Sequence, residues 1–155
     1  MNRRFTFGLV LGVVVAALVA TGISTYAQAK RPYRNGSVWE MNFIRMKPGM
    51  ESAYLTYLAG DWKKEHEAMK KEGLVLSYKV ITSEGHTPGD WNVLLMTEYK
   101  DLATMEANAE KAESVVMSAL ATDEQKVRQG YKDRLEIRDI IGDRTAREIV
   151  LEPKP

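Results

Sequence analysis

The stretch Asp90–Glu113, DWNVLLMTEYKDLATMEANAEKAE, changes its hydrophobic period partway through. Up to Tyr99 it is rich in apolar, aromatic and β-branched residues, as in a largely buried strand. After Asp101 the apolar residues recur at helical spacing, and aspartate is a residue type that caps helix N-termini. We therefore predict a strand over 91–99 that leads directly into an amphipathic helix from Leu102 to about Leu120.

Hydrophobic patterning on either side of this stretch predicts the remaining elements. Pro48 and Gly49 separate a first strand from a long helix, and Gly73 has the position of a left-handed residue after a helix end. The predicted order is that of an α+β, ferredoxin-like fold, β-α-β-β-α-(α)-β, with a four-stranded antiparallel sheet. The predicted bounds are strands over 38–47, 74–82 and 91–99, helices over 50–73, 102–120 and 122–137, and, after Gly142, a short last strand over 145–153.

Residues 1–29 have the pattern of a secretory signal peptide. Arg3 and Arg4 precede an apolar run that ends at Ala20, and Ala27-Gln28-Ala29 is a small-residue cleavage site. An uncleaved membrane anchor is the alternative, because the run approaches the roughly 20 residues that span a bilayer. We expect an exported protein, periplasmic or secreted, in which residues 30–37 are a flexible lead-in and residues 38–152 form the folded domain.

The charge balance and the absence of cysteine restrict the class of protein. Of the 22 Lys and Arg residues, Arg3 and Arg4 lie in the leader, which leaves 20 against 21 Asp and Glu. This near-balance argues against nucleic-acid binding and against electrostatic attachment to a membrane after signal cleavage. Without cysteine there is no disulfide, thiolate ligand or cysteine nucleophile. We interpret the arginines near the C-terminus, which lie among acidic residues, as a solvated, salt-bridged face: Arg128, Arg134, Arg138, Arg144 and Arg147.

Strand alternation sorts the predicted sheet into two faces, since residues two apart share a side. The face expected beneath the helices carries Trp39, Met41, Phe43, Leu74, Leu76, Tyr78, Val80, Trp91, Val93, Leu95, Thr97 and Tyr99. The other face is mixed and carries Glu40, Asn42, Ile44, Val75, Ser77, Lys79, Asn92, Leu94, Met96 and Glu98. Ile44, Val75, Leu94 and Met96 would lack cover on that open face, which predicts pairing with a second copy.

The mixed face also supplies the candidate ligand-binding residues, because it combines polar side chains with an adaptable methionine: Glu40, Asn42, Lys79, Met96 and Glu98. Lys79 and Glu98 come from neighbouring antiparallel strands and could pair across the sheet if the register allows it. The alternative is that Glu40, Lys79 and Glu98 only form satisfied ion pairs at an interface or in solvent.

No cofactor and no metal ion are expected. His86 has Glu84 and Asp90 nearby, but this spacing is not a recognised ligand pattern, and loop composition explains it equally well. His66 follows Trp62 by one helical turn and suits a half-buried, hydrogen-bonded histidine better than a catalytic base. The sequence has no glycine-rich phosphate loop, nucleophile elbow or zinc-binding spacing.

The element order and two segments, MKPGMESAYLTYL (46–58) and WNVLLMTEYKDLATME (91–106), resemble the dimeric α/β-barrel superfamily over Val38–Leu151. The resemblance implies that two copies pair through their open sheet faces and close a barrel. That superfamily includes cofactor-free monooxygenases, haem-degrading enzymes and stress-induced proteins. The haem-degrading branch is matched only at Asn42, seven residues before Gly49, and the Trp and His of its second helix have no counterpart here.

Two classes of function remain open from the sequence. One is an exported homodimeric binding or structural module that holds a small apolar or aromatic ligand in the barrel cleft. The other is a cofactor-independent enzyme of the monooxygenase or isomerase type acting on a small organic substrate. In that case Asn42 or Glu98 would position a proton or an oxyanion. No cluster of histidine, acid and nucleophile identifies catalytic residues, and a fold alone does not specify an activity.

Overall fold

The computed structural model describes residues 32–84, 87 and 89–152. The predicted leader and His86 lie outside the described residues. The chain divides into two units, of which Asn35–Val150 contains the helices and most of the sheet. In the other unit, the described residues are the outer ends of two strands, where Glu152 N donates a 2.9 Å hydrogen bond to Pro32 O.

The main unit is an α+β domain with a four-stranded antiparallel sheet in the order β2-β3-β1-β4. The sheet order and the element order are those of a ferredoxin-like fold, as the sequence predicts. Along the chain the elements are β1 (Tyr33–Met46), α2 (Glu51–Tyr57), the π-helical turn η1 (Leu58–Trp62), α3 (Lys63–Lys71), β2 (Ser77–Thr82), β3 (Val93–Tyr99), α4 (Leu102–Ala107), α5 (Ala109–Leu120), α6 (Glu124–Leu135) and β4 (Arg138–Leu151).

Three of the predicted boundaries differ most from the structure, and β2 and β3 also begin later than predicted, at Ser77 and Val93. β1 begins at Tyr33, so most of the predicted lead-in is strand, an arrangement that satisfies backbone groups a loop would leave to solvent. β4 has 14 residues and continues through Gly142, which lacks the positive φ of a chain reversal. The helix predicted over 102–120 is two helices that meet at Asn108, whose side-chain amide donates to Thr104 O at 2.8 Å.

The helix ends follow the predicted chemistry. The Asp101 carboxylate accepts a 2.7 Å hydrogen bond from Thr104 N, and Asp123 does the same for Lys126 N at 2.9 Å, so both cap a helix N-terminus. Gly73 has a φ of +68° after α3, the left-handed conformation predicted for it. In the described part of the chain, no helix is long and apolar enough to cross a membrane.

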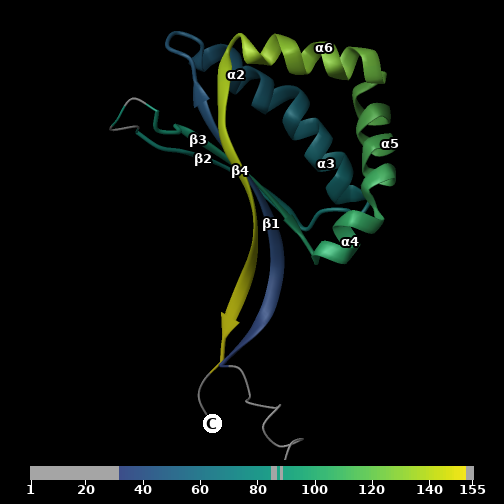
Figure 1. Ribbon diagram of the computed structural model, residues 1–155. Coiled ribbons are helices and arrows are strands. Elements are labelled where there is room, and N and C mark those ends of the chain that lie inside the picture. Colours follow the sequence, from purple (N-terminus) through teal and green to yellow (C-terminus); the bar gives the residue numbers. More distant parts are fainter. Residues whose placement is uncertain (1–31, 85–86, 88, 153–155) are drawn as a thin grey trace, which may run out of the picture. The chain divides into compact units, whose positions relative to one another are not determined.

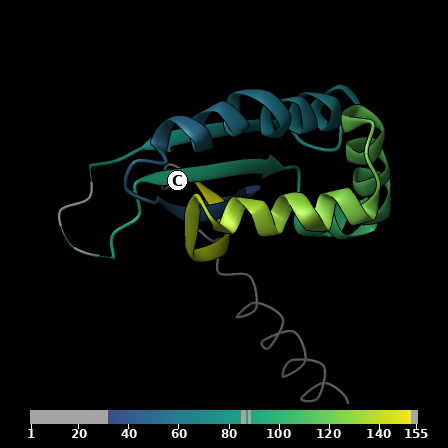
Figure 2. The same ribbon diagram turned by 90° about the horizontal axis from the view of Figure 1, so that it is seen from above.

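The helices cover one face of the sheet (Figures 1 and 2). One hydrophobic core joins α2 and η1 to the inner strands through Ile44, Met46, Tyr54, Leu58, Trp62, Val93 and Leu95. A second, smaller core joins the end of α3 to α5, where Met69, Leu74 and Val75 are buried against Val115 and Val116.

The strand register corrects the predicted orientation of β1. Asn42 is paired with Leu95 and Ile44 with Val93, and directly paired residues share a side of an antiparallel sheet. Because Val93 and Leu95 are buried beneath the helices, Glu40, Asn42 and Ile44 face the helices too. The predicted faces are therefore correct for the paired residues of β2 and β3 and wrong for β1.

The exposed, helix-free face thus has a different composition from the one predicted. It carries Trp39, Met41 and Phe43 of β1 together with Leu94, Met96 and Glu98 of β3 and Lys79 of β2. Trp91, predicted beneath the helices, makes an edge-to-face contact with Phe43 on this side. Val75, predicted on the open face, precedes β2 and is buried in the second core.

Candidate functional site

A cavity of ≈ 380 Å³ lies between the helix layer and the sheet. Its wall combines aromatic and aliphatic side chains with the polar side chains of Glu40, Asn42, Arg138 and Asp143. The lining residues come from β1, α2, η1, β3, α6 and β4: Glu40, Asn42, Tyr54, Tyr57, Trp62, Leu95, Tyr131, Arg138, Ile140 and Asp143. We call this space the main cavity; a more open pocket of ≈ 470 Å³ lies between α3 and α5.

A smaller cavity of ≈ 150 Å³ lies between α2, α3 and the helices α5 and α6. Its polar lining includes Asp61, Glu65, Lys126 and Arg134. Tyr57 lines both spaces, so its ring forms part of the wall between them.

The helix that supplies Tyr54 and Trp62 contains the π-helical turn η1. Tyr54, Leu58, Trp62 and His66 are spaced four apart, and all four are buried. In a regular α-helix, with 3.6 residues per turn, each step of four residues rotates a side chain by about 40° around the axis. The wider turn of η1 opposes this drift, so the four residues stay on the face toward the sheet.

Two arginines stack on the tyrosines of this region. The guanidinium carbon of Arg134 is 4.6 Å from the centre of the Tyr57 ring. The guanidinium carbon of Arg138 is 5.5 Å from the Tyr54 ring and 5.8 Å from the Tyr131 ring. We call Tyr54, Tyr57, Tyr131, Arg134 and Arg138 the arginine–tyrosine cluster.

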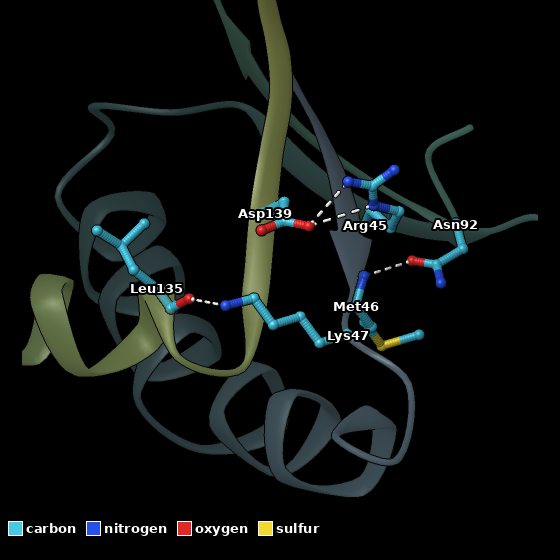
Figure 3. Close-up of polar contacts among 6 residues, drawn as sticks. All are labelled: Arg45, Met46, Lys47, Asn92, Leu135 and Asp139. Atoms are coloured by element: carbon cyan, nitrogen blue, oxygen red, sulfur yellow. Dashed lines mark hydrogen bonds and ion pairs between the residues drawn. The ribbon is translucent and has the colours of Figure 1, made fainter. Parts of the chain in front are cut away.

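Polar contacts around Met46 hold the start of β4, and hence Arg138, in place (Figure 3). Lys47 N donates to Ile137 O at 3.0 Å, which places Arg138 beside Met46 in the sheet. Lys47 Nζ donates to Leu135 O at the end of α6 at 2.7 Å, and Arg45 forms a two-pronged ion pair with Asp139 at 2.9 and 3.2 Å. On the other side, Asn92 Oδ1 accepts from Met46 N at 2.8 Å.

Arg138 is a buried cation without a counterion. It is only 8% exposed, and no carboxylate among the described residues lies within ion-pair distance of it. In the described part of the chain, three buried side-chain polar atoms lack a hydrogen-bond partner: Tyr54 Oη, Arg134 Nε and Arg138 Nε. All three belong to the arginine–tyrosine cluster, on the walls of the two cavities.

Burial sets the ionisation of the cavity groups. It raises the pKa of Tyr54, an effect that Arg138 and Arg134 oppose, and it raises the pKa of Tyr57 to about 12. Both hydroxyls therefore keep their protons at neutral pH and can donate hydrogen bonds. In the smaller cavity, burial raises the pKa of Glu65 to about 7 against the attraction of Arg134, with a further rise from Asp61.

The candidate residues proposed from the sequence do not form one site. Glu40 and Asn42 line the main cavity, and Glu40 accepts a 3.2 Å hydrogen bond from Tyr99 Oη. Lys79, Met96 and Glu98 lie on the opposite, helix-free face. Of the two residues considered for an enzymatic role, only Asn42 therefore reaches the cavity.

The predicted cross-strand pairing of Lys79 with Glu98 is not formed. The register places Ser77 opposite Glu98, and the Ser77 hydroxyl donates to that carboxylate. Lys79 lies opposite Met96, and its ammonium is 5.0 Å from the centre of the Trp39 ring. His66 is hydrogen-bonded as the sequence indicates, through Nδ1 to Trp62 O at 2.8 Å and through Nε2 to the Thr97 hydroxyl at 3.0 Å.

Sequence reasoning missed the arginine–tyrosine cluster as a site. It assigned Arg134 and Arg138 to a solvated, salt-bridged face, an interpretation that holds for Arg128, which pairs with Glu124 at 3.1 Å. The available signal was the spacing of Tyr131 and Arg134, which places both on one side of α6; Arg138 follows as the first residue of β4. The surrounding acidic residues obscured that signal.

Comparison with protein-family models and with curated proteins finds no match. Among solved structures, the chain is similar to the crystal structure of a dimeric ferredoxin-like protein from an uncultured marine organism. The two share 20% sequence identity, the alignment covers 79% of this chain and 99% of that chain, and the TM-score is 0.34. The ferredoxin-like fold of this chain is evident from its own element order and sheet order.

Proposed function

We propose that this chain is a small-molecule-binding domain and that its ligand, which has an apolar or aromatic part, occupies the main cavity. The observation that carries the proposal is the buried, unpaired Arg138 on the wall of a space of ≈ 380 Å³. Binding sites for small molecules are typically cavities of roughly 300 to 1,000 Å³ with mostly apolar and aromatic walls and a few placed polar groups.

The energetic cost of the cavity supports this proposal. A buried charge without a partner costs several kcal/mol, and an unsatisfied buried hydroxyl costs about 1 to 3 kcal/mol. Arg138 Nε and Tyr54 Oη are unsatisfied buried atoms of this kind, and both residues line the main cavity. A ligand that accepts hydrogen bonds there would offset this cost, which gives binding a source of free energy.

Fluorescence of Trp62 tests the proposal, because Trp62 is the one tryptophan on the cavity wall and the chain has three. In a Trp39→Phe/Trp91→Phe background, 2-naphthol should quench Trp62 saturably. Asn42→Phe, which fills part of the cavity, should abolish that quenching. Asn35→Phe on the exposed part of the same strand is the matched control. Quenching that survives Asn42→Phe would place the probe elsewhere and contradict the proposal.

We also propose that two copies of the chain pair through the helix-free face of the sheet. Supporting this, its centre holds Trp39, Met41, Phe43, Leu94 and Met96, which are only partly buried within one chain. An aromatic and methionine-rich centre with charged groups beside it is the usual composition of an interface. A second copy is the partner that presents a matching patch, since a two-fold interface uses the same surface twice.

The oligomeric state tests this pairing. Fully burying an apolar side chain of this size is worth about 1.5 to 3 kcal/mol, so the five partly exposed side chains supply a substantial driving force. Leu94→Glu should give a folded monomer by light scattering at micromolar concentration. Leu55 is a residue of α2 that is 41% exposed, so Leu55→Glu should leave the dimer intact. A wild-type monomer at that concentration would refute the pairing.

Export is the remaining part of the proposal. It is supported by the charged start, the apolar run and the Ala27-Gln28-Ala29 site of the sequence. Mass spectrometry of the protein recovered from the periplasm or medium should find Lys30 as the first residue. An intact leader would favour the membrane-anchor alternative instead.

A further inference from the structure

The arginine–tyrosine cluster indicates the chemical class of the ligand, an inference that rests on the proposed binding function. Arg138 and Tyr54 both line the main cavity, and each has a buried donor atom without a partner, Nε and Oη; the guanidinium carbon is 5.5 Å from the centre of the Tyr54 ring. Neither donor has an acceptor among the described residues. The missing partner is therefore an acceptor, and beside a buried guanidinium the most favourable acceptor is an anion.

The number of charges at this wall favours a monoanion. Among the residues that line the main cavity, Arg138 is the one arginine. Arg134 lines the smaller cavity and stacks on the Tyr57 ring. A single guanidinium matches a carboxylate, whose two oxygens accept two parallel N–H bonds. The Tyr54 hydroxyl can donate to the same group, since burial raises its pKa and keeps its proton in place.

The acidic residues of the cavity do not compete for Arg138. The Lys47–Ile137 hydrogen bond places Arg138 beside Met46, and Glu40 is six residues further along β1. At about 3.3 Å per residue, the two backbone positions are roughly 20 Å apart. Glu40 is also engaged by Tyr99 Oη at 3.2 Å, and Asp143, the other acidic residue of the wall, is five residues beyond Arg138 on β4, roughly 17 Å along the strand. The cavity is therefore basic near Arg138 and acidic toward Glu40, so it can orient a ligand that carries one negative end.

The space between these ends is suited to a planar ring. Tyr57, Trp62 and Tyr131 line it with aromatic surface, and Leu95 and Ile140 add aliphatic surface. Aromatic rings pack against such walls in offset-stacked or edge-to-face arrangements.

We infer that the ligand is an aromatic monocarboxylate whose carboxylate binds Arg138 and the Tyr54 hydroxyl while its ring lies between Tyr57, Trp62 and Leu95. The geometry distinguishes this class from neutral aromatic compounds, which leave the two donors unpaired. It also distinguishes it from aromatic compounds that carry an alkylammonium group, which would place a cation against Arg138.

The test compares 2-naphthoate with 2-naphthamide, which has the same shape and no charge. Dissociation constants are measured by calorimetry on the full chain and on four variants. We expect naphthoate to bind at least about tenfold more tightly than naphthamide to the wild type, the discrimination typical of one charge-assisted hydrogen-bonded pair. Arg138→Met should bring the ratio close to one, and Tyr54→Phe should reduce it in part. Arg138→Lys should give an intermediate ratio, because it keeps the charge and loses the planar fork.

The matched control is Arg128→Met, which removes an exposed arginine of α6 and should leave the ratio unchanged. If Arg138→Met does not fold, the Tyr54→Phe and Arg138→Lys ratios decide the question. Equal binding of naphthoate and naphthamide to the wild type would overturn the carboxylate inference and leave the proposed binding function standing. If neither compound nor 2-naphthol binds, the proposed function fails, and the inference fails with it. A ratio that persists in both Arg138→Lys and Tyr54→Phe would also overturn the inference.

Discussion

Glu65→Gln should stabilise the folded protein at pH 8 and leave its stability almost unchanged near pH 5. Glu65 lines the smaller cavity, where Asp61 and Tyr57 face it from its own helix and Arg134 and Lys126 from α6. Burial raises the pKa of its carboxyl from 4.5 to about 7, although Arg134 lowers it and Asp61 adds to the rise. The folded protein thus retains a proton on Glu65 over a pH range in which the unfolded chain has lost it.

The sign and size of the effect follow from this difference. Below pH 4.5 both states are protonated and Glu65 contributes no pH dependence. Between pH 4.5 and about 7 the stability of the folded state falls as pH rises, and above that range the full penalty is present. At about 1.4 kcal/mol per pH unit the full penalty would be about 3 kcal/mol, which solvent screening of this half-buried group reduces to about 1 to 2 kcal/mol.

Urea denaturation followed by circular dichroism at pH 5 and pH 8 measures the difference between Glu65→Gln and the wild type. Burial lowers the pKa of His66, so both proteins lose stability as pH falls below 6.5, and this effect cancels in the difference. Glu113→Gln, an exposed change on α5, is the control and should have no effect at either pH. A gain of equal size at pH 5 and pH 8, or a loss at pH 8, would refute the reasoning.

Three further predictions about the local structure are tested by urea denaturation. Gly73→Ala should lower the free energy of unfolding by about 1 kcal/mol, because Gly73 has a φ of +68°. Gly60→Ala should raise it by about 0.5 to 1 kcal/mol, because open space surrounds that helical glycine. A change of the same sign in both variants would contradict this contrast between a left-handed and a helical glycine. Thr97→Val should cost about 1 to 2 kcal/mol by removing the hydroxyl that bonds His66 Nε2, and Thr97→Ser should restore most of it. Asp123→Ala should cost about 1 kcal/mol by uncapping α6, and no loss would mean that the cap contributes nothing.

The sequence predicts the order of strands and helices because each element depends on local signals. Asp101 and Gly73 act where they stand in the chain, and the structure confirms the role of each at a helix end. Alternation within β2 and β3 is equally local, so their faces are also predicted correctly. The orientation of β1 is different, because it depends on which of its two faces meets the helices.

Hydrophobicity predicts the wrong face of β1 to lie beneath the helices, and the structure gives a physical reason. Trp39, Met41 and Phe43 are the larger apolar residues, and a single chain would be expected to bury them beneath its helices. The helix side instead holds the main cavity, where Glu40 and Asn42 are tolerated because they border open space rather than packed core. In most strands the more apolar face is the buried one. In β1 the outer face is apolar and the inner face is partly polar, and nothing in the sequence of the strand itself indicates this.

The arginine–tyrosine cluster as a whole could not be predicted from the sequence because it joins α2 to α6 and β4, which are far from α2 along the chain. Tyr54 comes from α2, Tyr131 from α6 and Arg138 from the start of β4. Their meeting is fixed by contacts such as Lys47 Nζ with Leu135 O, which no spacing within α6 can indicate. From composition alone, an arginine among acidic residues is expected in solvent. Arg138 differs because the neighbouring carboxylate of Asp139 pairs with Arg45 instead.

The buried polar groups that lower the stability of this fold are concentrated in one region. Arg138, Tyr54 and Arg134 carry the unsatisfied buried atoms of the described residues, and Glu65 carries the carboxyl pKa that burial raises to about 7. All four line cavities that share the Tyr57 ring, while the second core around Met69, Leu74 and Val75 is apolar. A packed core would be more stable with apolar residues at these positions. Local departures from the rules of stable packing are expected where a protein binds or reacts, so the same residues that lower stability identify the cavities as the place of function.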